Sequence, residues 1–172
     1  MALTGFMGTG KSTIGRVLSL ETGMKLIDLD ELIEKDAGMA VKDIFRERGE
    51  GCFRDMESGL IKRLTQGEFG SGVIVSTGGG AVVRRENREA LRSWGTIVCL
   101  CSTVDEILKR VENRDDRPLL NTGEKRESIE RLLKEREEAY RDCDLVVDTA
   151  SVSVKEAVRI IRNFVEERLE NK

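Results

Sequence analysis

The stretch from Gly5 to Thr13 carries the strongest chemical signal in the chain. It reads Gly-Phe-Met-Gly-Thr-Gly-Lys-Ser-Thr and fits G-x-x-x-x-G-K-[ST], the pattern of a phosphate-binding loop, or P-loop. Glycines let the backbone pass close to a polyphosphate with its N–H groups pointing inward. The lysine then reaches the outer phosphates, and the next hydroxyl ligates Mg²⁺. The residues expected to bind the nucleotide are Gly8, Thr9, Gly10, Lys11, Ser12 and Thr13.

The surroundings of the loop decide between a phosphate site and a chance glycine-rich turn. Apolar Ala2 and Leu3 precede it, and an amphipathic helix is predicted over Ser12–Thr22. Strand, loop and helix follow in the order that the motif requires, and the positive end of the helix dipole would attract phosphate. The context therefore favours nucleotide binding. Lys11 is expected to be an exposed side chain that contributes little to the core.

Asp28 and Asp30 form a second candidate site, where a short predicted strand, Lys25–Asp28, ends. Mg²⁺ prefers carboxylate and phosphate oxygens, so one aspartate could hold the metal and the other could accept the hydrogen of a hydroxyl group. The predicted strand Val73–Ser76 lacks the terminal aspartate that many P-loop proteins use for metal, which shifts that role to Asp28. The alternative is that Asp30 caps the helix that follows it.

Arg54 and Glu57 lie three residues apart in a predicted helix, about Gly51–Thr65. They could form an ordinary solvated ion pair. A guanidinium held by a carboxylate is also suited to bind a substrate carboxylate through two hydrogen bonds. Three glycines, Gly78, Gly79 and Gly80, follow a buried strand and form either a flexible turn or a place where backbone approaches a small ligand closely.

Strand-like apolar runs alternate with amphipathic helices along the whole chain. This pattern predicts a three-layer α/β/α fold with a five-stranded parallel sheet, in a single domain over residues 1–172. Ligands bind at the carboxyl ends of such strands, where the P-loop, the two aspartates and the three glycines all fall. The predicted strands are a very short first one before Gly5, then Lys25–Asp28, Val73–Ser76, Ile97–Cys101 and Leu145–Asp148.

Two further segments carry charged residues. A polar, arginine-rich stretch at about residues 112–125 contains the one proline, Pro118. It is expected to be a mobile lid over the site, with a solvated disordered loop as the alternative. Glu127–Asp142 is predicted as one continuous charged helix, and residues 41–48 and 51–65 as two helical pieces separated at Gly49.

Composition excludes several kinds of chemistry. There is no histidine, so acid–base work falls to carboxylates, and a net charge of −3 with few aromatic residues does not favour nucleic-acid binding. Four cysteines without a C-x-x-C pair suggest free thiols in a reducing cytoplasm. No apolar run is long enough to span a membrane. The short start leaves open whether the chain is trimmed or is a piece of a longer polypeptide.

Five features together resemble the shikimate kinase family over essentially the whole chain. They are the P-loop, Asp28-x-Asp30, Phe53-Arg54-x-x-Glu57, Gly78-Gly79-Gly80 and Arg117-Pro118-Leu119-Leu120, in the order and approximate spacing of that family. The resemblance implies a nucleoside-monophosphate-kinase-like fold that uses ATP and Mg²⁺. It implies transfer of the γ-phosphoryl group to the 3-hydroxyl of shikimate, in the biosynthesis of chorismate and aromatic amino acids. A monomer is expected, but the sequence does not give the oligomeric state.

The resemblance also assigns roles to individual residues. Asp30 would bind and orient the shikimate hydroxyl and could serve as general base, and Asp28 would support Mg²⁺. Acceptor binding would involve a helical segment at about residues 30–65. Arg54 and Arg136 would bind the shikimate carboxylate, and Glu57 would order Arg54. Gly78 to Gly80 would contact the ring through their backbone. Arg110 would stack on adenine, and Arg117 would close over the phosphates. The family's adenine loop commonly carries a proline, and here Thr149–Val154 has none.

Two competing interpretations are weaker. A GTP-dependent switch would need an N-K-x-D signature and a D-x-x-G after a strand, and neither is found. Gluconate kinase or a nucleotide kinase is the runner-up, but the arginines on the acceptor side suit a carboxylate.

Overall fold

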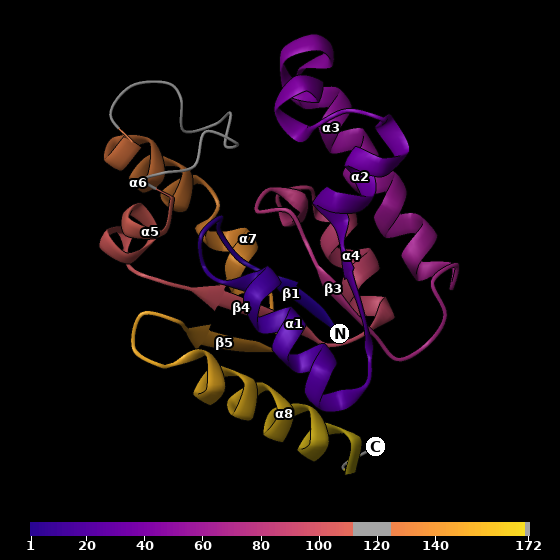
Figure 1. Ribbon diagram of the computed structural model, residues 1–172, viewed down its shortest axis with the longest axis vertical. Coiled ribbons are helices and arrows are strands. Elements are labelled where there is room, and N and C mark those ends of the chain that lie inside the picture. The colour runs from indigo at the N-terminus through magenta and orange to yellow at the C-terminus, as the bar shows by residue number, and fades with distance from the viewer. Residues whose placement is uncertain (112–124, 171–172) are drawn as a thin grey trace.

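The computed structural model describes residues 1–111 and 125–170, and these form a parallel five-stranded sheet with helices on both faces (Figure 1). The strand order is β2-β3-β1-β4-β5. The predicted α/β architecture is therefore confirmed. The elements are β1 Ala2–Thr4, α1 Lys11–Thr22, β2 Lys25–Asp28, α2 Leu29–Ala37, α3 Val41–Thr65, β3 Val73–Ser76, η1 Ala81–Val83, α4 Arg85–Trp94, β4 Ile97–Cys101, α5 Val104–Val111, α6 Lys125–Glu135, α7 Glu137–Arg141, β5 Leu145–Asp148 and α8 Val154–Glu170.

The central strand β1 is only three residues long, yet it pairs with β3 on one side and β4 on the other. Helices α1 and α8 cover one face of the sheet, and α4 and α7 lie on the opposite face (Figure 1). Strand β4 contributes to both layers because successive side chains of a strand point to opposite faces. Val98 and Leu100 join the cluster beneath α1 and α8, whereas Ile97 joins the cluster beneath α4 and α7.

A third apolar cluster joins the P-loop to α5 and α6. Phe6 and Met7 from the loop pack with Ile107 and Val111 of α5 and with two side chains of α6, Ile129 and Leu132. This packing holds the outer side of the phosphate loop against two helices. The loop is therefore part of a packed core and not an isolated turn.

Helix α3 is bent at Gly49, whose φ of 79° and ψ of 166° are not helical. The positive φ is a conformation that glycine adopts readily and other residues rarely do. The prediction of two helical pieces separated at this glycine is confirmed. The bend separates the piece that carries Arg54 and Glu57 from the piece that precedes Gly49.

The prediction of one continuous helix over Glu127–Asp142 is wrong. Helix α6 ends at Glu135, and α7 begins at Glu137. Between them Arg136 has φ −107° and ψ 4°, and its buried side chain reaches toward the carbonyl of Gly79. No glycine or proline marks the break, so a long-range contact accompanies it where local sequence predicts none.

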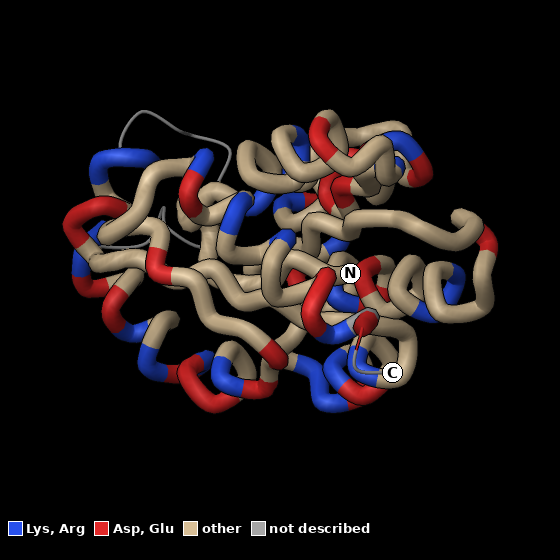
Figure 2. Tube along the Cα trace, turned by 90° about the horizontal axis from the view of Figure 1, so that it is seen from below, with Lys and Arg blue, Asp and Glu red and all other residues tan. Residues whose placement is uncertain are grey.

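The expected lid lies outside the described residues, apart from Lys125 at the start of α6. On the side of the molecule seen in Figure 2, Lys and Arg are interspersed with Asp and Glu along the helices. Within the two described ranges, no helix combines the length and the hydrophobicity that crossing a membrane requires.

Candidate active site

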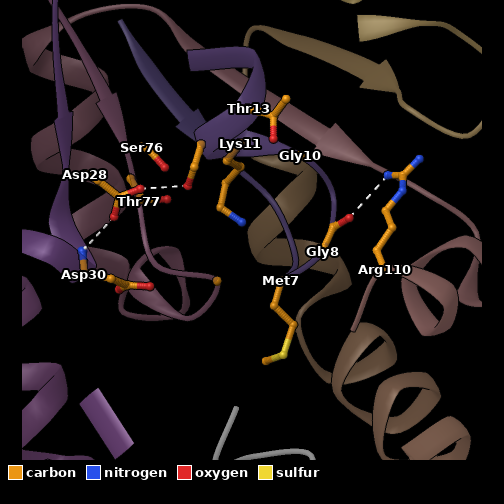
Figure 3. A pocket seen from close by; sticks show the side chains of 12 residues that line it. Met7, Gly8, Gly10, Lys11, Thr13, Asp28, Asp30, Ser76, Thr77 and Arg110 are labelled. Carbon is orange, nitrogen blue, oxygen red and sulfur yellow. Dashed lines mark hydrogen bonds between the residues drawn. The ribbon is translucent and has the colours of Figure 1, made fainter. Parts of the chain in front are cut away.

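A pocket of about 310 Å³ opens at the carboxyl ends of β1, β2 and β3 (Figure 3). The P-loop forms one wall, and the ends of β2 and β3 form the other. The side chain of Lys11 lies inside the curve of the loop, with the aspartates across from it (Figure 3). The lining residues are Met7, Gly8, Gly10, Lys11, Ser12, Thr13, Asp28, Asp30, Ser76, Thr77, Gly79 and Arg110.

Glycine is required at Gly5 for two reasons. Its φ is 123°, and a Cβ atom there would lie 2.1 Å from the carbonyl oxygen of Leu100 in β4. No side chain fits such a position, so only glycine allows the loop to leave β1 along this path. Thr9 closes the loop from inside, because its buried hydroxyl donates to the carbonyl of Phe6 at 2.7 Å.

Lys11 is buried, with 8% of its surface exposed, so the expectation of an exposed side chain is wrong. Its Nζ atom donates to the carbonyls of Gly5 at 2.9 Å and Phe6 at 2.8 Å. The ammonium group thus stabilises the folded P-loop through hydrogen bonds to its backbone. A bound polyphosphate would offer this group oxygens of opposite charge in place of, or beside, neutral carbonyls.

Ser12, Asp28 and the backbone of Asp30 form a connected hydrogen-bond chain (Figure 3). The Ser12 hydroxyl donates to Asp28 Oδ2 at 2.8 Å, and Asp28 Oδ1 accepts the backbone N–H of Asp30 at 3.1 Å. The helix cap is therefore Asp28, and the alternative that Asp30 caps α2 is wrong. Capping leaves the Asp30 carboxylate to line the pocket.

Arg54 and Glu57 are not an ordinary solvated pair. The side chain of Glu57 is fully buried, that of Arg54 is 12% exposed, and Nη1 of Arg54 donates to Oε2 of Glu57 at 2.5 Å. Glu50 accepts from the other side of the same guanidinium at 2.8 Å, and the rings of Phe45 and Phe53 lie 5.9 and 5.4 Å from its central carbon. Two carboxylates and two rings thus fix the plane of Arg54.

Glycine is required at Gly78 and Gly80 because side chains of the site occupy the space where a Cβ atom would lie. A Cβ atom at Gly80 would lie 2.3–2.5 Å from the guanidinium of Arg54. One at Gly78 would lie 2.4 Å from Oε1 of Glu57 and 2.8 Å from Oδ1 of Asp30. The sequence predicted close backbone approach to a ligand here. The close approach in the described structure is to the charged side chains of the site.

Tyr140 is a site residue that sequence reasoning missed. Its hydroxyl donates to the carbonyl of Gly79, and Nη1 of Arg136 reaches the same oxygen at 3.4 Å. Burial raises the pKa of Tyr140 to about 12, so the phenol keeps its proton and remains a donor. The sequence could have indicated this role, because Tyr140 is the only tyrosine in the chain and lies one helical turn after Arg136, a predicted site residue.

Arg110 connects the P-loop to the loop after β5. Its guanidinium donates to the carbonyl of Gly8 at 3.2 Å (Figure 3). It also donates to the hydroxyl of Thr149 at 3.0 Å and to the carbonyl of Thr149 at 2.9 Å. The structure therefore brings together the predicted residues of the P-loop, both aspartates, Arg110, and the Arg54, Arg136 and triple-glycine group. Arg117 lies outside the described residues.

The electrostatics of the site centre on Glu57. Burial is the largest effect and raises the pKa of Glu57 to about 7, although Arg54 opposes the shift; the negative charge of Asp30 adds to it. The folded protein therefore holds this proton more tightly than the unfolded chain, where the ordinary value is 4.5. The resulting stabilisation is fully present below about pH 4.5 and is lost as pH rises through about 7.

We expect Glu57→Gln to remove this component from the pH dependence of stability. Between pH 5 and 8, the unfolding free energy of the wild type should fall relative to that of the variant by on the order of 3 kcal/mol. Urea unfolding of both proteins at several pH values measures this difference. Glu50→Gln is the matched control, because it changes the exposed partner of Arg54 and keeps the buried carboxyl group. Parallel curves for wild type and Glu57→Gln would contradict the prediction.

Comparison with known proteins agrees with this geometry. The family model for shikimate kinase matches residues 7–166. A shikimate kinase of Geobacter sulfurreducens is 44% identical over 167 residues, covering 97% of this chain and 91% of its own length.

Solved structures give the same result. The structure of shikimate kinase from Acinetobacter baumannii in complex with shikimate has a TM-score of 0.91 and 32% identity, covering 99% of this chain and 93% of its own. The Aquifex aeolicus enzyme has a TM-score of 0.82 and 32% identity, covering 98% of each chain. The gluconate kinase and nucleotide kinase alternatives are thereby set aside, and the chain belongs to the shikimate kinase family.

Proposed function

We propose that this protein transfers the γ-phosphoryl group of ATP to the 3-hydroxyl of shikimate, giving shikimate 3-phosphate and ADP. Membership of the shikimate kinase family supports the reaction. One observation supports the assignment of the acceptor side. Arg54 lies against Gly80 and Arg136 reaches the adjacent Gly79, so both guanidinium groups lie near Asp30, which lies against Gly78. Two guanidinium groups next to a carboxylate suit an acceptor that has both a carboxylate and a hydroxyl group.

Phosphoryl transfer depends mainly on positioning and on neutralising charge. We assign Lys11 and the backbone N–H groups of the P-loop to the phosphates, with Arg110 against the nucleotide base. Asp30 would accept a hydrogen bond from the attacking hydroxyl and take up its proton as the O–P bond forms. From the sequence alone, Arg117 is assigned to charge neutralisation over the phosphates.

Ser12 and Asp28 are suitable ligands for Mg²⁺. A hydroxyl and a carboxylate are hard oxygen ligands, and the hydrogen bond of 2.8 Å already places them side by side at the P-loop. Within the described residues no three acidic, histidine or cysteine side chains form a metal-binding group, so the other ligands would be phosphate oxygens and water. When bound, the ion would neutralise charge on the transferred group.

The decisive experiment is a coupled ADP-release assay on a panel of acceptors. Shikimate should give turnover, whereas gluconate, nucleoside monophosphates and buffer alone should give little, and omitting Mg²⁺ should stop the reaction. Turnover that is equally fast without shikimate would contradict the proposal. We also place the protein in the cytoplasm, consistent with four free cysteines, and expect a monomer, which light scattering tests.

We expect Arg136→Ala to weaken shikimate binding far more than ATP binding. A charge-assisted hydrogen bond is worth about 1.5–3 kcal/mol, so the KM for shikimate should rise roughly tenfold to a hundredfold. The KM for ATP should stay within about a factor of three. Arg131→Ala is the control, since this exposed arginine of α6 pairs with Glu135 away from the pocket. Equal effects on both substrates would argue against the role assigned to Arg136.

We expect Gly80→Ala to impair acceptor binding through Arg54. The backbone of Gly80, with φ −105° and ψ −4°, is open to alanine, but the new Cβ atom would displace the Arg54 guanidinium. The KM for shikimate should rise roughly tenfold, because a misplaced binding group loses its geometry. Gly59→Ala is the matched control: it lies in α3 with open space around it and should be neutral or slightly stabilising. A normal KM for Gly80→Ala would show that Arg54 need not hold its position.

A further inference from the structure

Gly79 lies beside the P-loop and accepts hydrogen bonds from the start of α7. A Cβ atom at Gly79 would lie 3.1 Å from the backbone nitrogen of Met7 and 3.6 Å from the carbonyl carbon of Phe6. The carbonyl oxygen of Gly79 accepts from the hydroxyl group of Tyr140 and lies 3.4 Å from Nη1 of Arg136. This one peptide group is therefore in contact with both the phosphate side and the acceptor side of the pocket.

The chain on either side of the glycine turn is anchored. The N–H and the hydroxyl group of Thr77 both donate to the carbonyl of Leu3 in β1, at 3.0 and 3.2 Å. After the turn, the side chain of Asn87 in α4 donates to the carbonyl of Ala81 at 2.8 Å. The two donors to Gly79 therefore act on a turn whose ends are already fixed.

Tyr140 is held in place by more than its hydroxyl group. Its ring packs against the apolar cluster that contains Ala81 and against the cluster that contains Phe6. Its N–H donates to the carbonyl of Arg136 at 3.0 Å, within the first turn of α7. A phenylalanine at this position would keep the ring and the helix and would remove only the donor to Gly79.

Arg136 differs from Arg54 in what holds its guanidinium group. Arg54 donates to two carboxylates, those of Glu57 and Glu50. Arg136 is 7% exposed, and among the described residues no carboxylate forms an ion pair with it. Its hydrogen bond to the Gly79 carbonyl, at 3.4 Å, is longer than the usual range of about 2.7–3.2 Å. The guanidinium group is thus held only weakly and can still bind a carboxylate.

We propose that Tyr140 is a positioning residue for the acceptor, because its hydroxyl group satisfies the Gly79 carbonyl and leaves the guanidinium group of Arg136 to the acceptor carboxylate. A half-buried carbonyl that loses its donor attracts the next donor within reach, since an unsatisfied acceptor is costly. Here that donor is Nη1 of Arg136. Without the Tyr140 hydroxyl group, Arg136 would be held at Gly79 and drawn away from the acceptor. The effect on acceptor binding rests on the proposed function, whereas the movement of Arg136 does not.

The first test is the kinetics of Tyr140→Phe. The KM for shikimate should rise roughly threefold to tenfold, while kcat and the KM for ATP change less than about twofold. Glu137→Gln is the matched control, because this exposed residue of α7 pairs with Arg141 and should leave both KM values unchanged. Circular dichroism checks that both variants are folded. An unchanged KM for shikimate in Tyr140→Phe, or an equal rise in both KM values, would overturn the proposal.

The second test is a double-mutant cycle with Arg136→Ala. If the hydroxyl group acts through Arg136, adding Tyr140→Phe to Arg136→Ala should raise the KM for shikimate less than about twofold further. A hydroxyl group that only stabilises the fold, or that acts on the glycine turn alone, would give the same rise in both backgrounds. Such additivity would overturn the role assigned to Tyr140.

The third test does not depend on activity. Crystal structures of the wild type and of Tyr140→Phe, both without ligand, give the distance from Nη1 of Arg136 to the Gly79 carbonyl oxygen. We expect this distance to shorten from 3.4 Å to about 3.0 Å or less in the variant. An unchanged distance would overturn the proposal. A wild type that neither binds nor phosphorylates shikimate, combined with the expected shortening, would instead count against the proposed function.

Discussion

Lys11→Ala is expected to lower kcat by roughly a thousandfold or more. The side chain supplies the one ammonium group that the P-loop encloses, and removing a preorganised charge from the transferring phosphoryl group has effects of this size. Steady-state kinetics with saturating shikimate and ATP measures the loss. Lys109→Ala is the control, because this exposed lysine of α5 pairs only with Glu106 among the described residues and should leave kcat unchanged.

Stability must be measured alongside activity for this variant. Lys11 also donates to the carbonyls of Gly5 and Phe6. The Phe6 carbonyl keeps its hydrogen bond from Thr9, but the Gly5 carbonyl loses the lysine donor, so the substitution should cost about 1–3 kcal/mol. Circular dichroism and urea unfolding separate this cost from the catalytic loss, because a folded but inactive variant isolates the role of the charge. Near-normal kcat in Lys11→Ala would contradict the assignment of the P-loop lysine.

The strands and most helix limits could be predicted because their signals are local. Four-residue apolar runs such as Val73–Ser76 and Leu145–Asp148 coincide with β3 and β5. Gly49 marks the bend in α3 because its positive φ is unusual for any other residue. The placement of the aspartates and glycines beside the P-loop follows from the rule that ligands bind at the carboxyl ends of parallel strands.

The errors concern residues whose state depends on distant partners. Nothing near Arg136 in the sequence predicts a break between α6 and α7, because the contact that accompanies it is with Gly79, more than fifty residues away. The burial of Lys11 requires the loop to be folded around it. Asp28 serves as the cap of α2 because it ends β2 and also accepts from Ser12, a geometry that spacing alone does not distinguish from capping by Asp30.

Asp30→Asn is expected to lower kcat by about a hundredfold to ten-thousandfold, the usual contribution of a group that transfers a proton in the transition state. Asparagine has nearly the same shape and can still accept a hydrogen bond, but it cannot take up the proton of the attacking hydroxyl. The KM for ATP should change little, since Asp30 lies across the pocket from the P-loop (Figure 3). Glu31→Gln is the matched control, as the next residue of α2 is exposed and pairs with Arg16.

A second readout for Asp30→Asn is independent of catalysis. The negative charge of Asp30 raises the pKa of Glu57, so its removal should bring that pKa below about 7. The pH range over which the Glu57 contribution to stability is lost should then move to lower pH. Urea unfolding of Asp30→Asn, compared with wild type and Glu57→Gln across the same pH series, measures the shift. An unchanged pH range would show that the two carboxyl groups do not interact beside Gly78, and a kcat close to that of the wild type would exclude Asp30 as the proton acceptor.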